Sequence, residues 1–247
     1  MFDRIDAFVR DVSTIETEIA LAERLDEICR EMGFAYFALT HHVDIRHTPG
    51  PAIRLANYPS DWVDYFDAHK LGPSDPVHRA SHLTSVGFAW SKLSRLIALT
   101  PRDLQVLELA ERRGIGDGFT VPANVPGEAN GSCSFAIQAG RSLEEDQLPL
   151  AQLVGAFAFE AARRVCGVRM TGPLGEPRLT DRQRDCVIWA ARGKSDWEIA
   201  RILGLSHETV TEYLKRARER YGVGKRTLLA VHALFDGTIS FNDVMKR

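Results

Sequence analysis

The chain has 247 residues, of which 45% are hydrophobic and 26% are charged, an ordinary composition for a soluble protein of one large or two modest domains. The N-terminus lacks the apolar run of a secretory signal, and no stretch approaches the ~18 apolar residues of a membrane span. The four cysteines are scattered without a C-x-x-C pair, which argues against a disulfide framework or a zinc site. We therefore expect a cytoplasmic protein with neither a metal nor a cofactor.

The formal net charge of −2 conceals an uneven distribution. Residues 178–247 carry 14 Lys and Arg against 9 Asp and Glu, whereas residues 1–177 carry 17 against 24. A basic C-terminal segment beside an acidic body favours a nucleic acid as the partner of that segment, although surface charge also fluctuates by chance.

Residues 167–177 (GVRMTGPLGEP) are rich in Gly and Pro and show no apolar periodicity, which is typical of an interdomain linker. They divide the chain into predicted domains over 1–166 and 178–247. In the first domain, Thr100 and Pro101 are typical of a helix start. Helices at both ends with strands between them predict an α+β fold, an α-β-α sandwich around an antiparallel sheet. The expected helices span 15–32, 62–69, 100–113 and 143–165, and the expected strands span 34–39, 53–57, 118–122 and 132–138.

The C-terminal segment is predicted to be an all-α domain of four helices, over 180–191, 195–203, 206–221 and 225–235. Thr180, Ser195 and Ser206 are typical N-cap residues, and Gly204 breaks the chain between two helices. Helix, Gly-containing turn and helix form a helix-turn-helix, whose second helix enters the DNA major groove. A small solvated bundle has the same periodicity, so the pattern alone leaves both interpretations open.

The predicted recognition helix has two distinct faces. Val210, Leu214 and Ala217 share the side that packs inward. The opposite face presents polar side chains, among which Thr211 and Lys215 are four residues apart and are expected to reach base edges. The residues of this outer face are His207, Glu208, Thr211, Lys215 and Arg218, and phosphate contacts are expected from Lys194, Ser195, Thr209, Arg216 and Arg226.

Residues 179–231 closely resemble the DNA-binding domain of the LuxR family. Gln183 stands where the family usually has Glu, which preserves the capping chemistry, and Tyr213 stands where it usually has His. The resemblance implies a transcriptional regulator that binds a pseudo-palindromic operator as a homodimer. The matching residues are Leu179, Thr180, Arg182, Gly193, Lys194, Ser195, Glu198, Ile199, Ala200, Leu203, Thr209, Val210, Gly222, Val223 and Arg226.

Residues 57–77 are dense in aromatic side chains. Aromatic rings with polar atoms line many small-molecule pockets, although the same residues suit an ordinary core with Asp75 in a turn. Tyr58, Trp62, Asp75 before Pro76, and Trp90 are similar in spacing to the autoinducer-binding domain of LuxR-type quorum-sensing receptors. The ligand of that family is an N-acyl-homoserine lactone.

This resemblance implies a role for each matching residue. The Trp62 indole donates to the lactone carbonyl and Asp75 accepts from the ligand amide. Tyr58, helped by Ser134, donates to the acyl carbonyl, while Trp90 packs against the lactone ring. Phe66 stands where relatives often carry Tyr, which favours a more apolar acyl chain.

Three functions stay open. We expect a lactone-responsive regulator. The first alternative is a LuxR-type regulator without a partner synthase that responds to an aryl-type or non-lactone molecule. The second alternative is a lactone hydrolase. No Ser–His–Asp or paired-carboxylate arrangement stands out, and residues 132–134 (SCS) lack the nucleophile-elbow pattern, so we expect no enzyme. We interpret His41, His42 and His47 as a solvated strand end, and the pair His78 and His82 lacks a third metal ligand.

Overall fold

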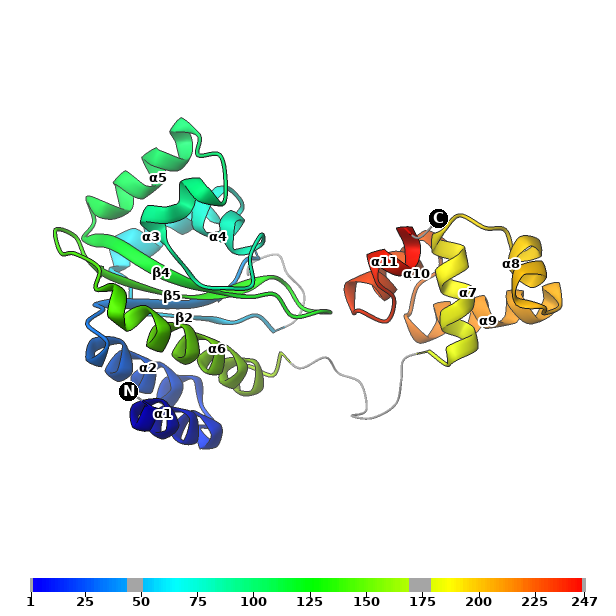
Figure 1. The fold of residues 1–247 in the computed structure, drawn as a ribbon, viewed down its shortest axis with the longest axis horizontal. Helices are drawn as coiled ribbons and strands as arrows, with labels where there is room; N and C mark the ends of the chain where they lie inside the picture. The colour runs from blue at the N-terminus through cyan, green and yellow to red at the C-terminus, as the bar shows by residue number, and fades with distance from the viewer. Residues whose placement is uncertain (1, 44–50, 169–178, 246–247) are drawn as a thin grey trace. The chain divides into compact units, whose positions relative to one another are not determined.

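A computed structural model describes residues 2–43, 51–168 and 179–245 (Figure 1). The chain forms two compact units, Met1–Val125 with Ala129–Arg169 and Met170–Arg247 with Pro126–Glu128. Each unit has its own hydrophobic core. The boundary between the units falls inside the predicted linker over 167–177, of which only residues 167 and 168 lie among the described residues.

The N-terminal unit contains a five-stranded antiparallel sheet of order β2-β1-β5-β4-β3. The expected α-β-α sandwich is confirmed, because α3, α4 and α5 cover one side of the sheet and α1, α2 and α6 cover the other (Figure 1). In chain order the elements are α1 (Phe2–Thr14), α2 (Glu18–Glu31), β1 (Tyr36–His41), β2 (Arg54–Ala56), α3 (Ser60–Ala68), α4 (Pro76–Ser81), β3 (Phe88–Ala89), α5 (Pro101–Glu111), β4 (Ile115–Ala123), β5 (Gly131–Gln138) and α6 (Leu148–Val165).

The two faces of this sheet carry side chains of different size. Successive side chains of a strand point to opposite faces, so the sequence SCSFAI of β5 places bulky and small residues on different sides. We call one side the large-residue face, which packs on α2 and α6: Phe37, Leu39, Phe119, Val121, Cys133, Phe135 and Ile137. We call the other the small-residue face, which α3, α4 and α5 cover: Ala38, Gly118, Thr120, Ser132, Ser134 and Ala136.

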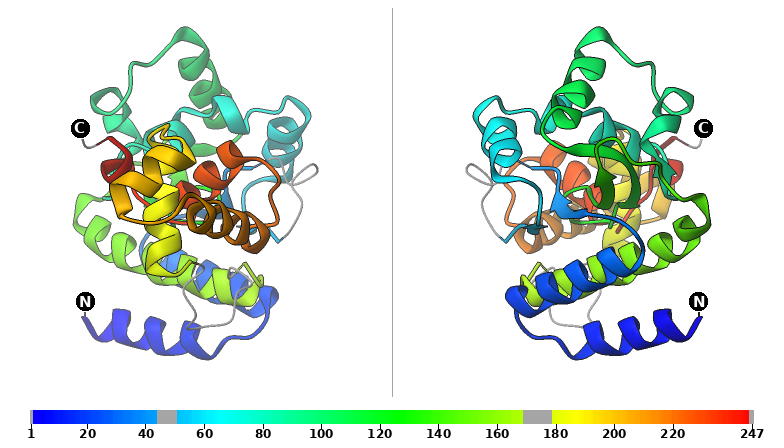
Figure 2. Two further views of the ribbon diagram at one scale, coloured as in Figure 1. Left: turned by 90° about the vertical axis from the view of Figure 1, so that its right-hand side faces the viewer. Right: turned by 90° about the vertical axis from the view of Figure 1, so that its left-hand side faces the viewer.

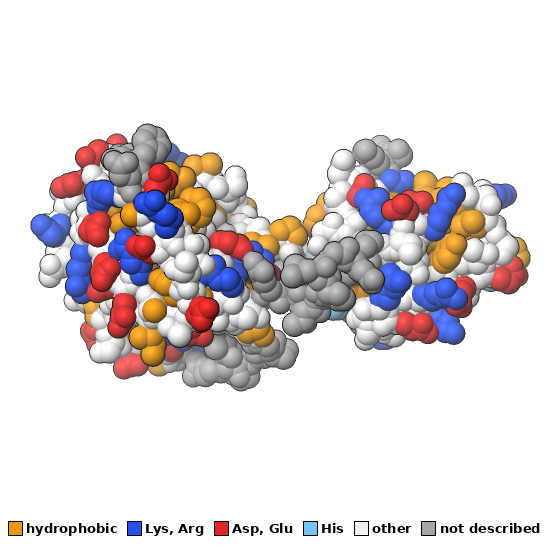
Figure 3. Space-filling view, turned by 90° about the horizontal axis from the view of Figure 1, so that it is seen from below, with side chains coloured by type: hydrophobic (Ala, Val, Ile, Leu, Met, Phe, Trp, Pro, Cys, Tyr) orange, Lys and Arg blue, Asp and Glu red, His pale blue; other side chains and the backbone are white. Residues whose placement is uncertain are grey.

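Helices α2 and α6 pack on the large-residue face, and α1 packs on α6 and α2 as the outermost helix of this side (Figures 1 and 2). Helix α1 was not expected, although Ile5, Phe8 and Val12 are buried at helical spacing. Helix α6 begins at Leu148 instead of at residue 143, and a short 3-10 turn, Glu145–Gln147, precedes it. On the side drawn in Figure 3, Lys and Arg are interspersed with Asp and Glu over this unit, so that side offers no single-sign surface.

The C-terminal unit contains the four expected helices, α7 (Asp181–Ala191), α8 (Asp196–Leu203), α9 (His207–Arg220) and α10 (Arg226–Phe235), followed by a short helix, α11 (Phe241–Met245). Thr180, Ser195 and Ser206 are the N-caps of the first three. Gly204 adopts a left-handed φ of 65° between α8 and α9, a conformation that glycine adopts without strain. None of the described helices has the length and apolar character needed to cross a lipid bilayer.

Candidate ligand-binding and DNA-binding sites

Four of the six residues predicted to bind a ligand lie in one hydrophobic cluster over the small-residue face. Trp62 and Phe66 are one turn apart on α3, with ring centroids separated by 5.8 Å. Tyr58 and Trp90 pack against the same cluster, together with Ala136 of β5. The structure therefore collects aromatic rings from two segments of the chain, residues 58–66 and Trp90, above one patch of sheet.

Ser134 joins this cluster through a hydrogen-bond chain. The Trp90 indole donates to the Thr120 hydroxyl at 2.8 Å, and the hydroxyls of Thr120 and Ser134 are also 2.8 Å apart. Thr120 and Ser134 are direct partners in the register of β4 and β5. These two hydrogen bonds fix the Trp90 ring against the sheet, which is compatible with the packing role that the resemblance implies for Trp90.

The Asp75 carboxylate caps a helix with one oxygen and has a second oxygen that can accept a hydrogen bond. Its Oδ1 accepts hydrogen bonds from the amides of Val77 at 2.7 Å and His78 at 3.1 Å, which caps the N-terminus of α4. Within the described residues, Oδ2 makes no hydrogen bond and is able to accept one from a ligand. The two interpretations of Asp75, turn residue and ligand acceptor, are therefore compatible.

Tyr58 and Trp62 each carry a hydrogen-bond donor in this cluster. Burial raises the pKa of the Tyr58 phenol, and the charge of Asp75 raises it further. The phenol therefore keeps its proton and can donate a hydrogen bond. Trp62 is only 6% exposed, and its indole nitrogen donates to no group in the described part of the chain.

A cluster of histidines borders the small-residue face, and sequence analysis missed it. His42 follows β1, and its Nε2 lies 2.9 Å from the Ser132 hydroxyl while its Nδ1 lies 2.8 Å from Nε2 of His82. Its ring also stacks on His78 at a centroid distance of 3.8 Å. The expectation of a solvated strand end is wrong for His42 and for His41, which is 5% exposed.

His47 lies outside the described residues. Among the residues that the structure does describe, no group of three or more His, Cys, Asp and Glu is arranged to hold a metal ion. The rings of His42, His78 and His82 (the His42 cluster) are joined by hydrogen bonding and stacking, and they also contact Ser132, Phe66 and the Gly72 carbonyl.

The recognition helix α9 has the two faces that its sequence predicts. Val210, Leu214 and Ala217 are buried against α7 and α8. Lys215 and Arg216 point outward with side chains 60% and 61% exposed, and their ion pairs are with Glu219 and Glu212. Exposed pairs of this kind contribute little to stability, so both cations are available to DNA. Glu208 and Thr211 are exposed on the same helix.

Several residues predicted to touch phosphates also build the helix ends. Ser195 caps α8 in a capping box with Glu198, and the Thr209 hydroxyl lies 3.0 Å from that of Ser206 at the start of α9. Hydrogen bonds from the Ser195 amide, then from Lys194 and the Ser195 hydroxyl, lower the pKa of Glu198 to about 2. These capped N-termini carry partial positive charge, which favours phosphate binding.

Arg226 and His207 also have protein partners. Arg226 pairs with Asp196 at 2.8 Å and donates to the Lys194 carbonyl, while Asp196 accepts from the Thr211 hydroxyl at 3.2 Å. Asp196 therefore orients both residues, a role that sequence analysis missed. The His207 ring stacks on Trp197 at 4.3 Å, and Trp197 is 70% exposed.

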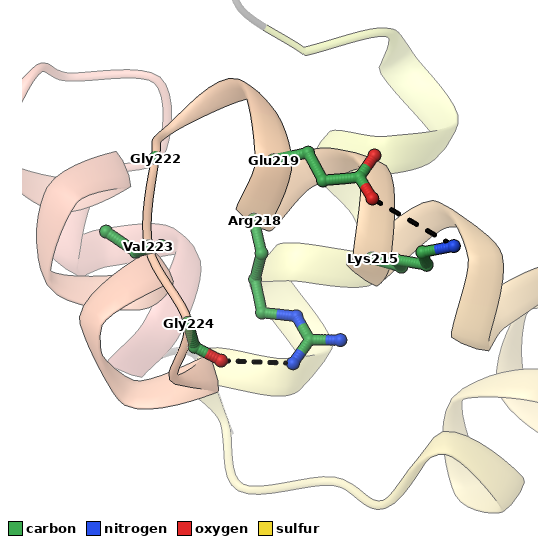
Figure 4. Close-up of a pocket in the computed structure, with 6 residues that line it drawn as sticks. All are labelled: Lys215, Arg218, Glu219, Gly222, Val223 and Gly224. Atoms are coloured by element: carbon green, nitrogen blue, oxygen red, sulfur yellow. Dashed lines mark hydrogen bonds and ion pairs between the residues drawn. The ribbon is translucent and has the colours of Figure 1, made fainter.

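A groove of about 340 Å³ lies where α9 ends (Figure 4). Arg218 donates across it to the carbonyl of Gly224 at 3.2 Å, and Lys215 pairs with Glu219 at its rim. The Arg218 guanidinium thus holds the turn after α9, whereas Lys215 keeps its exposed position. The residues that line the groove are Lys215, Arg218, Glu219, Gly222, Val223 and Gly224.

Comparison with known proteins accounts for both units. The model of the autoinducer binding domain matches residues 17–162, and the model of bacterial regulatory proteins of the luxR family matches residues 177–233. The chain belongs to the LuxR family of transcriptional regulators. Its N-terminal unit is an autoinducer-binding domain, and its C-terminal unit is a LuxR-type DNA-binding domain.

Named relatives align along most of this LuxR-type chain. The quorum sensing-dependent regulator RpaR of Rhodopseudomonas palustris is 29% identical over 237 residues, which cover 94% of this chain and 93% of RpaR. The transcriptional activator AhyR of Aeromonas hydrophila is 26% identical over 223 residues, which cover 89% and 86%. A structure of SdiA in complex with octanoyl-rac-glycerol matches with a TM-score of 0.70 at 24% identity, covering 97% and 96%, which supports the fold.

The structure brings the predicted residues of each LuxR-type site together, although their roles stay predictions. Tyr58, Trp62, Phe66 and Trp90 share one cluster, and Asp75 lies near Tyr58. Thr120 and the His42 cluster are additional residues on the same side of the sheet. The alternation of small residues along β5 (Ser132, Ser134, Ala136) was a local sign of this face. The strand pairing that brings Thr120 and His42 next to these residues is not local, so the sequence pattern did not reveal it.

Proposed function

We propose that this LuxR-family chain is a homodimeric quorum-sensing regulator that binds an N-acyl-homoserine lactone on the small-residue face and binds DNA through α9. The proposal rests on the grouping of Trp62, Tyr58 and Asp75 around one aromatic cluster. A buried lactone of this class has two carbonyl acceptors and one amide donor. The indole, the phenol and Oδ2 of the carboxylate supply the two donors and one acceptor that satisfy it.

A ligand titration tests the sensing half. Because a ligand that binds only the folded state stabilises it, a lactone at 100 times its Kd adds ~2.7 kcal/mol and raises the melting temperature by roughly 5–10 °C. Trp62→Phe keeps an aromatic ring but removes the donor, so we expect the lactone response to be lost. Trp189→Phe, in the C-terminal unit, is the matched control and retains it.

The absence of a shift with every acyl chain length would contradict the sensing half and leave only the DNA-binding half. A response in Trp62→Phe to a molecule without a lactone ring, together with loss of the lactone response, would support the alternative ligand class.

DNA binding is tested with two cationic side chains of α9 that have different expected roles. Lys215→Ala removes a donor from the exposed face and is expected to relax sequence preference by roughly 1–3 kcal/mol. Arg216→Ala removes a phosphate contact and is expected to weaken binding to all sequences while lowering the salt slope by about 1. Equal loss on specific and random DNA for Lys215→Ala would remove it from base recognition.

Dimerisation is supported by exposed apolar side chains on one helix of each unit. Leu153 and Phe157 are four residues apart on α6 and 38% and 41% exposed. On α10, Leu228, Val231 and Phe235 are 44%, 55% and 53% exposed. Two recognition helices one DNA turn apart need such a pairing. Sedimentation equilibrium of Leu153→Glu and Val231→Glu, each compared with wild type, tests each helix separately.

One arrangement favours the hydrolase alternative, because Ser132, His42 and His82 are linked by hydrogen bonds like a nucleophile, a base and an orienting group. Burial and then the neighbouring imidazoles His78, His82 and His41 lower the pKa of His42. The lowered pKa makes His42 a weaker base, and its orienting partner His82 is an imidazole instead of the carboxylate of a Ser–His–Asp triad, so we infer that these residues do not catalyse hydrolysis. Mass spectrometry tests this inference: the lactone is expected to disappear no faster with the wild-type protein than with Ser132→Ala.

A further inference from the structure

The wall opposite the small-residue face changes from apolar to polar along its length. Consecutive ring contacts join Trp62 to Phe66 at 5.8 Å, Phe66 to His78 at 6.0 Å, and His78 to His42 at 3.8 Å. On the sheet, Ala136, Ser134 and Ser132 follow the same direction along β5. A ligand whose lactone lies at Trp62 and whose acyl group extends along β5 therefore ends among imidazoles.

Ser132 has unused hydrogen-bonding capacity at this end. Its side chain is 1% exposed, and its hydroxyl makes one hydrogen bond in the described structure, to Nε2 of His42. A hydroxyl has one donor and two acceptor positions. If His42 donates to it, the Ser132 proton is free for a ligand.

His78 offers the complementary acceptor. A carbonyl oxygen only accepts, so the contact of His78 Nδ1 with the Gly72 carbonyl at 3.3 Å places a proton on Nδ1. In the neutral ring Nε2 then carries a lone pair, and within the described residues it has no hydrogen-bond partner. Ser132 meets the edge of the His42 ring at Nε2 and His78 stacks on its face, so the donor and the acceptor both adjoin one residue.

We propose that the acyl group of the ligand carries a hydroxyl at its far end, which accepts from Ser132 and donates to His78. This inference rests on the proposed function. The resulting chain of hydrogen bonds is complete: His82 donates to His42, His42 to Ser132, Ser132 to the ligand, the ligand to His78, and His78 to Gly72. A hydrocarbon terminus would leave the Ser132 proton and the Nε2 lone pair of His78 without partners, which is unfavourable.

This position refines the expectation drawn from Phe66. The apolar ring at residue 66 favours an apolar middle of the acyl group, and the imidazole next to it favours an oxygen beyond that middle. The terminal hydroxyl is compatible with an aliphatic chain and with an aryl ring, and the two are separated by experiment.

The test uses the full-length chain and lactones in pairs that differ by one oxygen. The pairs are N-hexanoyl and N-(6-hydroxyhexanoyl), N-octanoyl and N-(8-hydroxyoctanoyl), and N-(3-phenylpropanoyl) and N-[3-(4-hydroxyphenyl)propanoyl] homoserine lactone. Calorimetric titration is expected to give at least tenfold tighter binding of the hydroxylated member in the pair of matching length. The pair that shows it identifies the chain as aliphatic or aryl.

Two variants locate the preference. Ser132→Ala and His78→Phe are each expected to reduce it to less than threefold, because each removes one hydrogen bond that only the hydroxylated member makes. Ser142→Ala, an exposed serine of the same unit, is the matched control and keeps the preference. Because His78→Phe preserves a ring in the stack, it tests the acceptor even if Ser132→Ala folds poorly.

Equal or tighter binding of the unmodified lactone in all three pairs would overturn this inference and leave the proposed function standing. A hydroxyl preference that survives both variants would also overturn it. Failure of every lactone to bind would overturn the proposed function, and this inference with it.

Discussion

The two faces of the N-terminal sheet are made from alternate residues of the same strands, yet they serve different purposes. On β5, Cys133 and Phe135 are fully buried beneath α6, whereas Ser132 and Ser134 face aromatic rings and imidazoles with their hydroxyls. Because the side-chain period of a strand is two, one face can be packed for stability without constraining the other. The stabilising side and the proposed ligand side can therefore be altered separately, by substitutions one residue apart.

The largest expected effect is on the large-residue face. Phe135 is fully buried, and its ring lies 5.5 Å from that of Phe34. Phe135→Ala is expected to lower the free energy of unfolding by roughly 3–5 kcal/mol, since it removes apolar contacts and leaves a cavity. Urea unfolding of the N-terminal unit measures this. A loss below ~1 kcal/mol would mean that this face is not the stabilising one.

The next effect concerns the close approach of Trp90 to the sheet. A Cβ added at Gly118 would lie 2.8 Å from Trp90 Cε2 and 2.6 Å from the Phe135 carbonyl oxygen. Gly118→Ala is therefore expected to destabilise the unit by roughly 1–3 kcal/mol and to weaken ligand binding by displacing the indole. Gly224→Ala, where nothing lies within 4 Å of the added Cβ, is the control and should change neither. Unchanged ligand affinity in Gly118→Ala would separate Trp90 from the site.

Local signals predicted most elements of both units. Thr100 is the N-cap of α5, as expected, and it forms a capping box with Asp103. Burial raises the pKa of Asp103, but hydrogen bonds from Thr100 and Arg79 outweigh it and lower the pKa. Helix α1 was not predicted, because charged residues are interspersed along it and its buried stripe consists of only Ile5, Phe8 and Val12.

The candidate sites were predicted only in part, for a physical reason. Trp62 and Phe66 share a helix face, so their spacing carries the information. The contacts of Thr120 with Trp90 and of His42 with Ser132 span 30 and 90 residues. Contacts of this kind depend on strand register, which no local pattern in the sequence specifies.

A pair of neighbouring substitutions sharpens the comparison between the faces. Thr120 and Val121 are adjacent on β4 and point to opposite sides. Thr120→Val keeps the shape of the side chain but leaves the Trp90 indole and the Ser134 hydroxyl without their hydrogen-bond partner. We therefore expect it to lower the free energy of unfolding by roughly 1–2 kcal/mol and to weaken lactone binding about tenfold. Val121→Thr buries a hydroxyl against α6, with a similar cost but no change in lactone affinity. Equal losses of affinity in both variants would show that the faces are coupled.

The smallest effect depends on the dryness of the large-residue face. Cys29 of α2 is fully buried in its core, and burial, followed by the charge of Asp26, raises the pKa of its thiol from 9.0 to about 12. The folded state therefore retains a proton that the unfolded chain loses above pH 9, so stability from this thiol is complete below pH 9 and declines as pH rises towards 12. Between pH 8 and 10, wild type is expected to lose about 1 kcal/mol more than Cys29→Ala. Parallel pH profiles for the two proteins in urea unfolding would contradict this prediction. They would mean that water reaches the Cys29 thiol and that the large-residue face is not dry.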